Sequence, residues 1–343
     1  MERPTIIDIA RRVGVSKAAV SYALNGRAGV SAATRERILE VAAQLGWESG
    51  APARPMTHDR SGTVGVVLAG SPEALCADGP ALDWTAGAEA ALAEHGLSLQ
   101  VAFMPDGETE LATYRRWWTE RRVDGVLVPD LRTGDPRVRL LRELGMPAVL
   151  VGARDRAGEI AVLRTREDEE ARAVVAHLAG LGHRRIGHVR VRSDLARHRL
   201  RAAALDQSTV EATGAGCATA EISGAGAGNT ETAAAQATWR LLAAERPPTA
   251  IVYDNDRMAV AAVARSAELG VRVPADLAVL SWQDSMLCRV VTPAVTALSR
   301  DAGRDAEAAV RLLLELIETG AADDSDLPAG VLVPRASTAG ESG

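Results

Sequence analysis

The sequence predicts a chain of two parts: an all-α helix-turn-helix head, joined by a hinge to a larger α/β domain of two parallel-sheet lobes. Residues 1–47 show helical periodicity with capping residues at the helix ends. From Thr63 onward, short apolar runs alternate with stretches rich in Ala, Leu and Arg. A length of 343 residues also exceeds what one hydrophobic core usually serves. We therefore expect separate cores for the two parts.

Capping residues and a glycine predict where the first two helices of the head begin and end. Thr5 is a suitable N-cap for the first helix, and Asp8 follows where a negative charge favours a helix N-terminus. Gly14 ends this helix at a position that needs a left-handed backbone, and Ser16 caps a second helix over residues 17 to about 24. The apolar face of the first helix comprises Ile6, Ile9, Ala10 and Val13. This short connection favours a helix-turn-helix over other helical hairpins.

The outward face of the second helix is short and polar. Val20, Ala23 and Leu24 point to the core of the head. The opposite face carries Lys17, Ala18, Ser21, Tyr22 and Asn25. Ser31 caps a third helix that continues through residue 45, with a cationic start.

Charge is unevenly distributed along the chain. Residues 1–60 contain nine Arg or Lys and six Asp or Glu, which gives this segment a net charge of +3. Because the whole chain has a net charge of −6, the remaining residues carry a net charge of −9. A basic head on an acidic body favours contact with a polyanion at one end only. Together with the helix spacing, this charge favours a DNA-binding head over a three-helix bundle that touches no DNA.

The composition favours a cytoplasmic protein that is not an enzyme. Cys76, Cys217 and Cys288 are few, odd in number and far apart, which fits buried thiols in a reducing compartment. No apolar run approaches the roughly 20 residues that cross a bilayer, and no signal peptide is recognisable. The six histidines lack metal-binding spacing, and no acid/base or phosphate-cradling constellation is visible. We expect no catalytic residue, no metal site, no cofactor and no membrane contact.

The larger domain reads as parallel strands joined by helices. The predicted strands are 63–68, 97–103, 123–129, 148–152, 186–191, 250–253 and 277–282. A ligand is expected in the crevice at the carboxyl ends of such strands. Polar residues follow several of these strands: Ser71, Asp130, Arg192, Ser193, Asp254, Asn255, Asp256, Gln283 and Asp284. The glycine-rich stretch 214–228 lacks a P-loop lysine and is predicted to be a flexible loop.

Residues 5–47 carry a specific resemblance. The run from Thr5-Ile6-Ile7-Asp8 through Gly14-Val15-Ser16-Lys17 to Leu45-Gly46-Trp47 resembles the lactose-repressor (LacI/GalR) family. The resemblance implies that the second helix lies in the major groove, where Lys17, Ala18 and Tyr22 read base edges. The remaining DNA contacts are then expected from Thr5, Ser16, Ser21, Asn25 and Thr34. Family members more often carry arginine at the position of Tyr22. The operator sequences that they recognise are therefore not expected to apply to this chain.

The hinge departs most from the family. Members usually continue with Arg-Pro-Asn and a short helix whose leucine wedges into the minor groove. Here residues 48–56 contain Pro52 and Pro55, and Met56 falls at the wedge position. Pro55 removes a backbone donor, at about 3 kcal/mol if the helix is to form fully. A plain linker is the alternative for this segment.

The resemblance extends over almost the whole larger domain. Motifs such as Leu181-Gly182-His183 and Val273-Pro274-Ala275-Asp276 follow the family, whose domains resemble periplasmic sugar-binding proteins with three crossings between lobes. The resemblance implies ligand contacts from Ser71, Arg199, Asn255 and Gln283. Departures occur at Arg166-Glu167, at Ala202 and at Gln283-Asp284, where two aspartates are common. Because a lost carboxylate weakens binding of sugar hydroxyls, the pocket is expected to take another polar molecule or to be vestigial.

These observations predict a domain plan and a function. The domains are 1–47 (DNA-binding), 48–61 (hinge) and 62–343 (effector-binding and dimerisation), with an N-lobe of about 62–163 plus 291–319 and a C-lobe of about 164–290 plus 320–338. The chain is predicted to act as a homodimeric transcriptional repressor on a near-palindromic operator, controlled by a small polar effector. The alternatives are a regulator with a vestigial pocket and a sugar-binding protein without DNA function.

Overall fold

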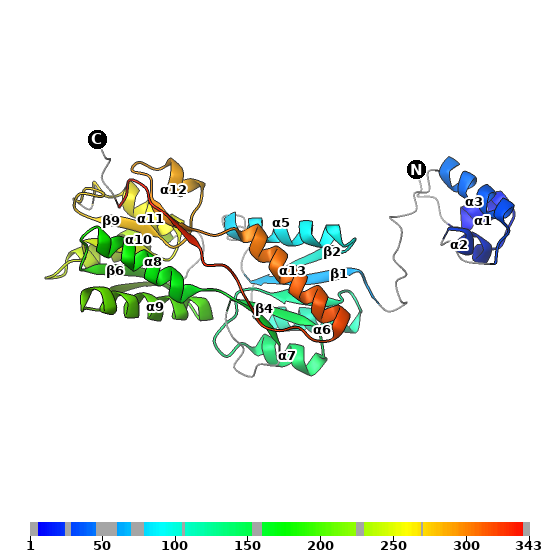
Figure 1. Ribbon diagram of the computed structural model, residues 1–343, viewed down its shortest axis with the longest axis horizontal. Helices are drawn as coiled ribbons and strands as arrows, with labels where there is room; N and C mark the ends of the chain where they lie inside the picture. The colour runs from blue at the N-terminus through cyan, green and yellow to red at the C-terminus, as the bar shows by residue number, and fades with distance from the viewer. Residues whose placement is uncertain are drawn as a thin grey trace. The chain divides into compact units, whose positions relative to one another are not determined.

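The computed structural model describes most of the chain, in two compact units. The described residues are 6–24, 29–45, 60–69, 79–104, 107–152, 160–223, 230–268 and 270–338. The units comprise residues 1–59 and 60–343, and each is considered by itself (Figure 1). None of the described helices is long and apolar enough to cross a membrane.

The small unit contains three helices around one core. They are α1 (Ile6–Val13), α2 (Lys17–Leu24) and α3 (Ala32–Gln44). Ile9, Val20 and Ile38 are fully buried at the centre, and they touch the small side chains Ala10, Ala23 and Ala42. Small residues let the helices approach closely, so a core this short can still exclude water.

The predicted caps of these helices are confirmed where the structure describes them. Gly14 has a φ of +77°, the left-handed conformation that a glycine adopts without strain. The Ala19 N–H donates to Ser16 Oγ at 3.2 Å, and the Thr34 N–H donates to Ser31 Oγ at 3.2 Å. Each of these bonds satisfies one of the backbone N–H groups that lack an intrahelical partner at the helix start, which favours the beginning of α2 and α3 at these residues. The predicted N-cap Thr5 lies outside the described residues.

The first lobe of the large unit is built on a six-stranded parallel sheet. Its strands lie in the order β11-β5-β4-β3-β1-β2. Their bounds are β1 (Thr63–Ala69), β2 (Ser98–Met104), β3 (Gly125–Val128), β4 (Ala148–Gly152), β5 (Ala161–Arg164) and β11 (Ser325–Asp326). The helices of this lobe are α5 (Gly79–Glu94), α6 (Gly107–Thr119), α7 (Pro136–Leu144) and α13 (Ala302–Thr319).

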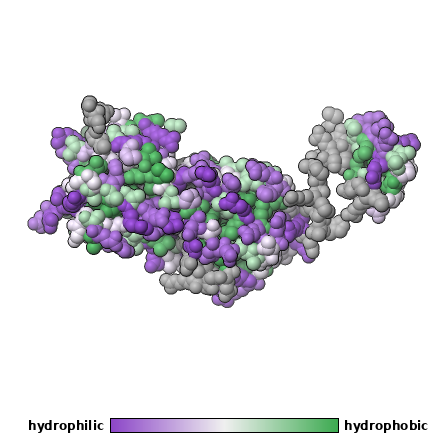
Figure 2. Space-filling view, in the orientation of Figure 1, coloured by the Kyte–Doolittle hydropathy of each residue, from purple (hydrophilic) through white to green (hydrophobic). Residues whose placement is uncertain are grey.

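The second lobe repeats this plan. Its sheet has the order β12-β10-β9-β8-β6-β7, with only β12 antiparallel to its neighbour. The strands are β6 (Ile186–Arg192), β7 (Ala218–Ser223), β8 (Ala250–Tyr253), β9 (Ala278–Ser281), β10 (Thr296–Ser299) and β12 (Val331–Val333). The helices are α8 (Glu167–Gly180), α9 (Ala196–Thr213), α10 (Thr230–Leu242), α11 (Asp256–Ala264) and α12 (Met286–Val290). Figure 2 shows hydrophilic residues interspersed with apolar ones over the visible face of both lobes. The central strands β3, β8 and β9 are buried along their whole length.

All seven predicted strands are present, but others were missed. The missed strands are β5, β7, β10, β11 and β12. The prediction of a loop over 214–228 is wrong for β7, since residues 218–223 pair in parallel with β6. Its sequence, Ala-Thr-Ala-Glu-Ile-Ser, has little intrinsic strand preference, so tertiary pairing decides its conformation.

The assignment of segments to lobes also needs correction. The chain crosses between the sheets three times: between β5 and α8, between β10 and α13, and between β11 and β12. The predicted first lobe includes 291–319, but β10, at the start of this segment, pairs with β9 in the second sheet. The predicted second lobe includes 320–338, but β11, at the start of this segment, pairs with β5 in the first sheet. Strand pairing between segments distant in sequence therefore decides to which lobe β10 and β11 belong.

Helices α5 and α13 of the first lobe cross at two glycines, so that their backbones are in direct contact. A Cβ on Gly87 of α5 would lie 2.6 Å from Gly303 Cα and 2.8 Å from the Gly303 carbonyl oxygen on α13. Backbone atoms cannot move aside as a flexible side chain can. The crossing therefore requires glycine at position 87 and fixes the separation of the two helices.

We expect Gly87→Ala to destabilise the protein by about 1–3 kcal/mol, because the added methyl group would force α5 and α13 apart. Chemical denaturation followed by circular dichroism measures this change. Gly79→Ala is the matched control in the same helix, where an added Cβ meets nothing within 4 Å. Equal effects of the two substitutions would contradict the close crossing.

Candidate functional site

The outward face of α2 is exposed as the sequence predicts. Lys17 and Ala18 are exposed, and Tyr22 keeps 40% of its surface accessible. Ser21, on the same face, is half-buried. Val20 and Ala23 anchor the opposite face in the core, so the orientation of these side chains is fixed by packing.

The ring of Tyr22 lies against a glycine. A Cβ on Gly29 would come within 3.2 Å of Tyr22 Cδ2, and Gly29 has a φ of +123°, which side-chain-bearing residues rarely adopt. The backbone at Gly29 therefore supports one side of the aromatic ring. This contact limits the directions in which the phenol can point.

The hydroxyl residues near α2 and α3 have local partners. Ser16 Oγ accepts the hydrogen bond from Ala19, and Thr34 Oγ1 lies 2.8 Å from Ser31 Oγ. Ser16 is exposed and Thr34 is half-buried, so both can still meet a phosphate oxygen. The other predicted DNA contacts, Thr5, Asn25 and Met56, lie outside the described residues.

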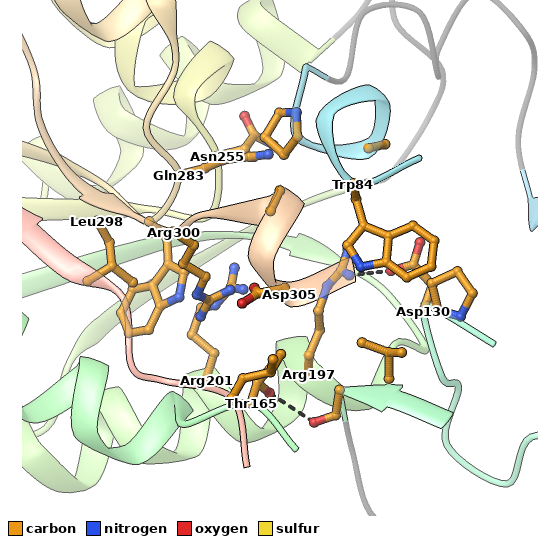
Figure 3. A pocket seen from close by; sticks show the side chains of 18 of the residues that line it. Trp84, Asp130, Thr165, Arg197, Arg201, Asn255, Gln283, Leu298, Arg300 and Asp305 are labelled. Carbon is orange, nitrogen blue, oxygen red and sulfur yellow. Dashed lines mark hydrogen bonds and ion pairs between the residues drawn. The ribbon is translucent and has the colours of Figure 1, made fainter. Parts of the chain in front are cut away.

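The large unit contains a pocket of about 360 Å³ between its two lobes (Figure 3). The first lobe contributes Trp84 from α5, Asp130 after β3 and Asp305 from α13. The second lobe contributes Asn255 after β8 and Gln283 after β9. Arginines also line it: Arg197, Arg201 and Arg300. A volume of this size, with polar groups converging on it, is that of a site for one small molecule.

Ion pairs hold the arginines of the second lobe in place. Arg201 donates to Glu167 Oε2 and to Asp254 Oδ1, both at 3.2 Å. His188 Nε2 lies 3.1 Å from the same Asp254 oxygen. Burial alone would raise the pKa of Asp254, but the His188 hydrogen bond and the charge of Arg201 outweigh it and hold that pKa well below its usual range. Asp254 therefore stays ionised and keeps the Arg201 guanidinium at the pocket wall.

Asp305 has a different environment. Burial raises the pKa of its carboxyl to about 6, the charge of Arg300 opposes this rise, and the charges of Asp301 and Glu170 add to it. Within the described chain, its carboxylate has no hydrogen-bond or ion-pair partner. A half-buried carboxylate without a partner is destabilising when it is ionised.

Other polar atoms of the pocket are buried and have no hydrogen-bond partner among the residues that the structure describes. They are His198 Nδ1, Trp282 Nε1 and Asp284 Oδ1. Burial, together with the charge of Arg201, lowers the pKa of His198 to about 4, so its ring is neutral at neutral pH. Buried polar groups are rarely left unpaired in native proteins, which indicates that a ligand or water satisfies them.

The structure places two of the four predicted ligand contacts at the pocket and one away from it. Asn255 and Gln283 line the pocket, whereas Ser71 lies outside the described residues. Arg199 does not line the pocket, and its Nη1 donates instead to Thr133 Oγ1 at 3.2 Å. Residues two positions apart lie about 200° apart around a helix, so Arg199 faces away from the pocket while Arg197 and Arg201 share the other face of α9.

Sequence reasoning missed several lining residues. They are Trp84, Arg197, Arg201, Arg300 and Asp305. The four-residue spacing of Arg197 and Arg201 was a usable signal, because such positions lie on one helix face. Nothing in the sequence pointed to Trp84 or Asp305, whose helices reach the pocket only through the three-dimensional packing of the first lobe.

The two lobes also touch beside the pocket. The Thr133 N–H donates to the Asp194 carbonyl, and the Ala196 N–H donates to the Leu131 carbonyl, both at 2.8 Å. Arg197 of α9 pairs with Asp130 of the first lobe next to these bonds. These contacts therefore join the two lobes directly at the edge of the pocket.

Comparisons with known proteins give matches for both structural units of the chain. Residues 5–49 match the model of bacterial regulatory proteins of the lacI family, and residues 175–338 match the periplasmic binding protein-like domain. An HTH-type transcriptional regulator from the aml 5' region of Streptomyces limosus is 32% identical over 320 residues, covering 92% of this chain and 88% of that protein.

Solved structures show the same fold. The CelR–cellobiose complex has a TM-score of 0.73 at 25% identity, covering 98% of this chain and 100% of that chain. The lac repressor dimer bound to operator and the anti-inducer ONPF has a TM-score of 0.83 at 24% identity, covering 98% of this chain and 99% of that chain. The second likeness shows the fold alone.

A helix-turn-helix head whose second helix has an exposed outward face, followed by a two-lobed domain with an interlobe pocket, defines a DNA-binding transcriptional regulator rather than an enzyme. The chain belongs to the lacI family of bacterial regulatory proteins.

We expect Asp305→Asn to stabilise the protein in a pH-dependent way. The folded-state pKa of Asp305 is raised from 3.8 to about 6, so its destabilising effect is absent below about pH 4, grows as the pH rises from about 4 to 6, and is constant at higher pH. The gain in melting temperature over the wild type should therefore increase between about pH 4 and pH 7. Asp323→Asn, at an exposed position, is the control. A gain that does not change with pH would refute the assignment.

Proposed function

We propose that this regulator represses transcription as a cytoplasmic dimer and that a small polar effector in the interlobe pocket controls its affinity for operator DNA. The observation that carries the proposal is the pocket itself, because polar residues of both lobes line one cavity of ligand size, and three buried polar atoms of the second lobe have no partner there within the described residues. A ligand that touches both lobes alters the angle between them, and the paired heads would then change their spacing on DNA.

The reading of DNA is assigned to the outward face of α2. In this proposal Lys17 donates to guanine acceptors, Ala18 contacts a thymine methyl group, and Tyr22 donates to or stacks on a base. The phosphate-contacting residues are then Thr5, Ser16, Ser21 and Thr34, with Asn25 as a further DNA contact and Met56 as the minor-groove wedge. The exposure of Lys17, Ala18 and Tyr22 supports this assignment.

The dimer would form through the large units. Three apolar side chains of α12 are exposed: Met286 by 68%, Leu287 by 43% and Val290 by 66%. Exposed neighbouring apolar residues on one short helix are typical of a surface that a partner covers. Two copies related by a two-fold axis would present two recognition helices to the halves of a near-palindromic operator.

A vestigial pocket is the alternative to a working effector site. The unpaired atoms Trp282 Nε1 and Asp284 Oδ1 favour a working site, because a pocket without a ligand would gain stability by losing them. Of the two inferred ligand contacts, Gln283 has the clearer role, since its side chain makes no hydrogen bond within the described residues while it lines the pocket.

We expect Lys17→Ala and Tyr22→Ala each to weaken binding to a fragment of the protein's own promoter by about 1–3 kcal/mol per half-site and to relax its sequence preference. Fluorescence anisotropy at several salt concentrations measures both effects. Gln44→Ala, at an exposed position near the end of α3, is the matched control. Unchanged affinity and preference in both recognition-helix variants would rule out this reading face.

We expect a screen of sugars, nucleosides and sugar phosphates to identify a compound that stabilises the protein by about 2.7 kcal/mol at a hundred times its Kd. Thermal denaturation of the full chain measures this effect. Gln283→Ala should reduce the stabilisation, whereas Gln207→Ala, an exposed substitution on α9, should not. Absence of any stabilising compound would favour the vestigial pocket.

A further inference from the structure

Asp305 is the one lining carboxylate of the pocket that has no cationic partner in the described chain. Asp130 pairs with Arg197, and Asp254 pairs with Arg201 at 3.2 Å. Asp284 pairs with Arg335 at 2.8 Å. Figure 3 shows Asp305 extending from the start of α13 into the middle of the pocket. An ionised group at this place is available to a ligand without breaking an existing ion pair.

The arginines of the pocket are already neutralised. Arg197 is held by Asp130, and Arg201 is shared between Glu167 and Asp254. Arg300 pairs with Glu170 and lies 3.3 Å from Glu167. An anionic ligand would have to displace one of these buried partners and would also add a negative charge beside Asp305, which is unfavourable on both counts. The uncompensated charge of the pocket is therefore negative.

An aromatic ring lines the same side of the pocket. Trp84 of α5 lies one helical turn before Gly87, and Asp305 of α13 lies two residues after Gly303, so the close crossing of α5 and α13 brings their helices together at the pocket. The other pocket indole, Trp282, already carries the Arg201 guanidinium 4.9 Å from its ring centroid. A carboxylate and an aromatic face are the two groups that together favour an ammonium ion, by charge pairing and by cation–π attraction.

We propose that the effector carries a protonated amine, which binds between the carboxylate of Asp305 and the indole of Trp84. This inference rests on the proposed function, in which the pocket takes the effector. The rest of the pocket offers neutral partners for hydroxyl groups, the amides of Asn255 and Gln283. With a volume of about 360 Å³, the pocket fits a small polyhydroxylated amine such as an amino sugar.

The test compares amines with matched neutral compounds on the full-length protein. Glucosamine, galactosamine and mannosamine are each titrated beside the parent sugar and the N-acetyl derivative, with affinity measured by calorimetry. At least one amine should bind about tenfold more tightly than both of its neutral counterparts. Asp305→Asn should remove this difference, and Trp84→Leu should reduce it. Asp323→Asn, a matched loss of charge at an exposed position, should leave it unchanged.

The outcomes separate this inference from the proposed function. Equal binding of the amines and the neutral sugars, or an amine affinity that Asp305→Asn does not change, would overturn the inference. If a neutral sugar, nucleoside or sugar phosphate binds the pocket and no amine does, the effector site stands and the amine assignment fails. If no compound of either set binds, both the effector site and the amine assignment fail.

Discussion

Glu170 is the residue on which the arrangement of the lobes depends, because its buried carboxylate links all three crossings of the chain. It lies on α8, directly after the first crossing. Its Oε1 accepts a hydrogen bond from Arg300 Nε at 2.7 Å, at the second crossing, and from the Gly330 N–H at 2.8 Å, at the third. A buried carboxylate needs such partners, and removal of one partner of a buried pair typically costs about 3–5 kcal/mol.

The same network reaches the pocket. Arg300 also contacts Glu167, which binds Arg201, and Arg201 binds Asp254. Charged groups from α8, α9, the end of β8 and the second crossing are thus joined in one chain of ion pairs. Because buried ion pairs tolerate little change in geometry, the side chains at the pocket wall and the segments between the lobes are positioned together. A ligand that disturbs this wall would act on the crossing segments as well.

The head is held together by a small aliphatic core and helix caps. Its core consists of a few aliphatic residues, with Ile9, Val20 and Ile38 at the centre and alanines at the helix contacts. Such a core has little area to bury, and the caps at Ser16 and Ser31 therefore matter for where the helices begin. This packing leaves Lys17, Ala18 and Tyr22 on one exposed face, which is the arrangement that the proposed reading of base edges requires.

The sequence by itself determined the elements whose signals are local. The caps at Ser16 and Ser31, the turn at Gly14 and seven apolar strands follow from neighbouring residues, and the family motifs add the two-lobed plan. Only the tertiary structure decided where β7, β10 and β11 pair, because weak strand formers take their conformation from distant partners. It also decided that Arg197 and Arg201, rather than Arg199, face the pocket, and that Asp305 lies in it. A pocket between lobes is made by residues far apart in sequence, so its members share no local pattern.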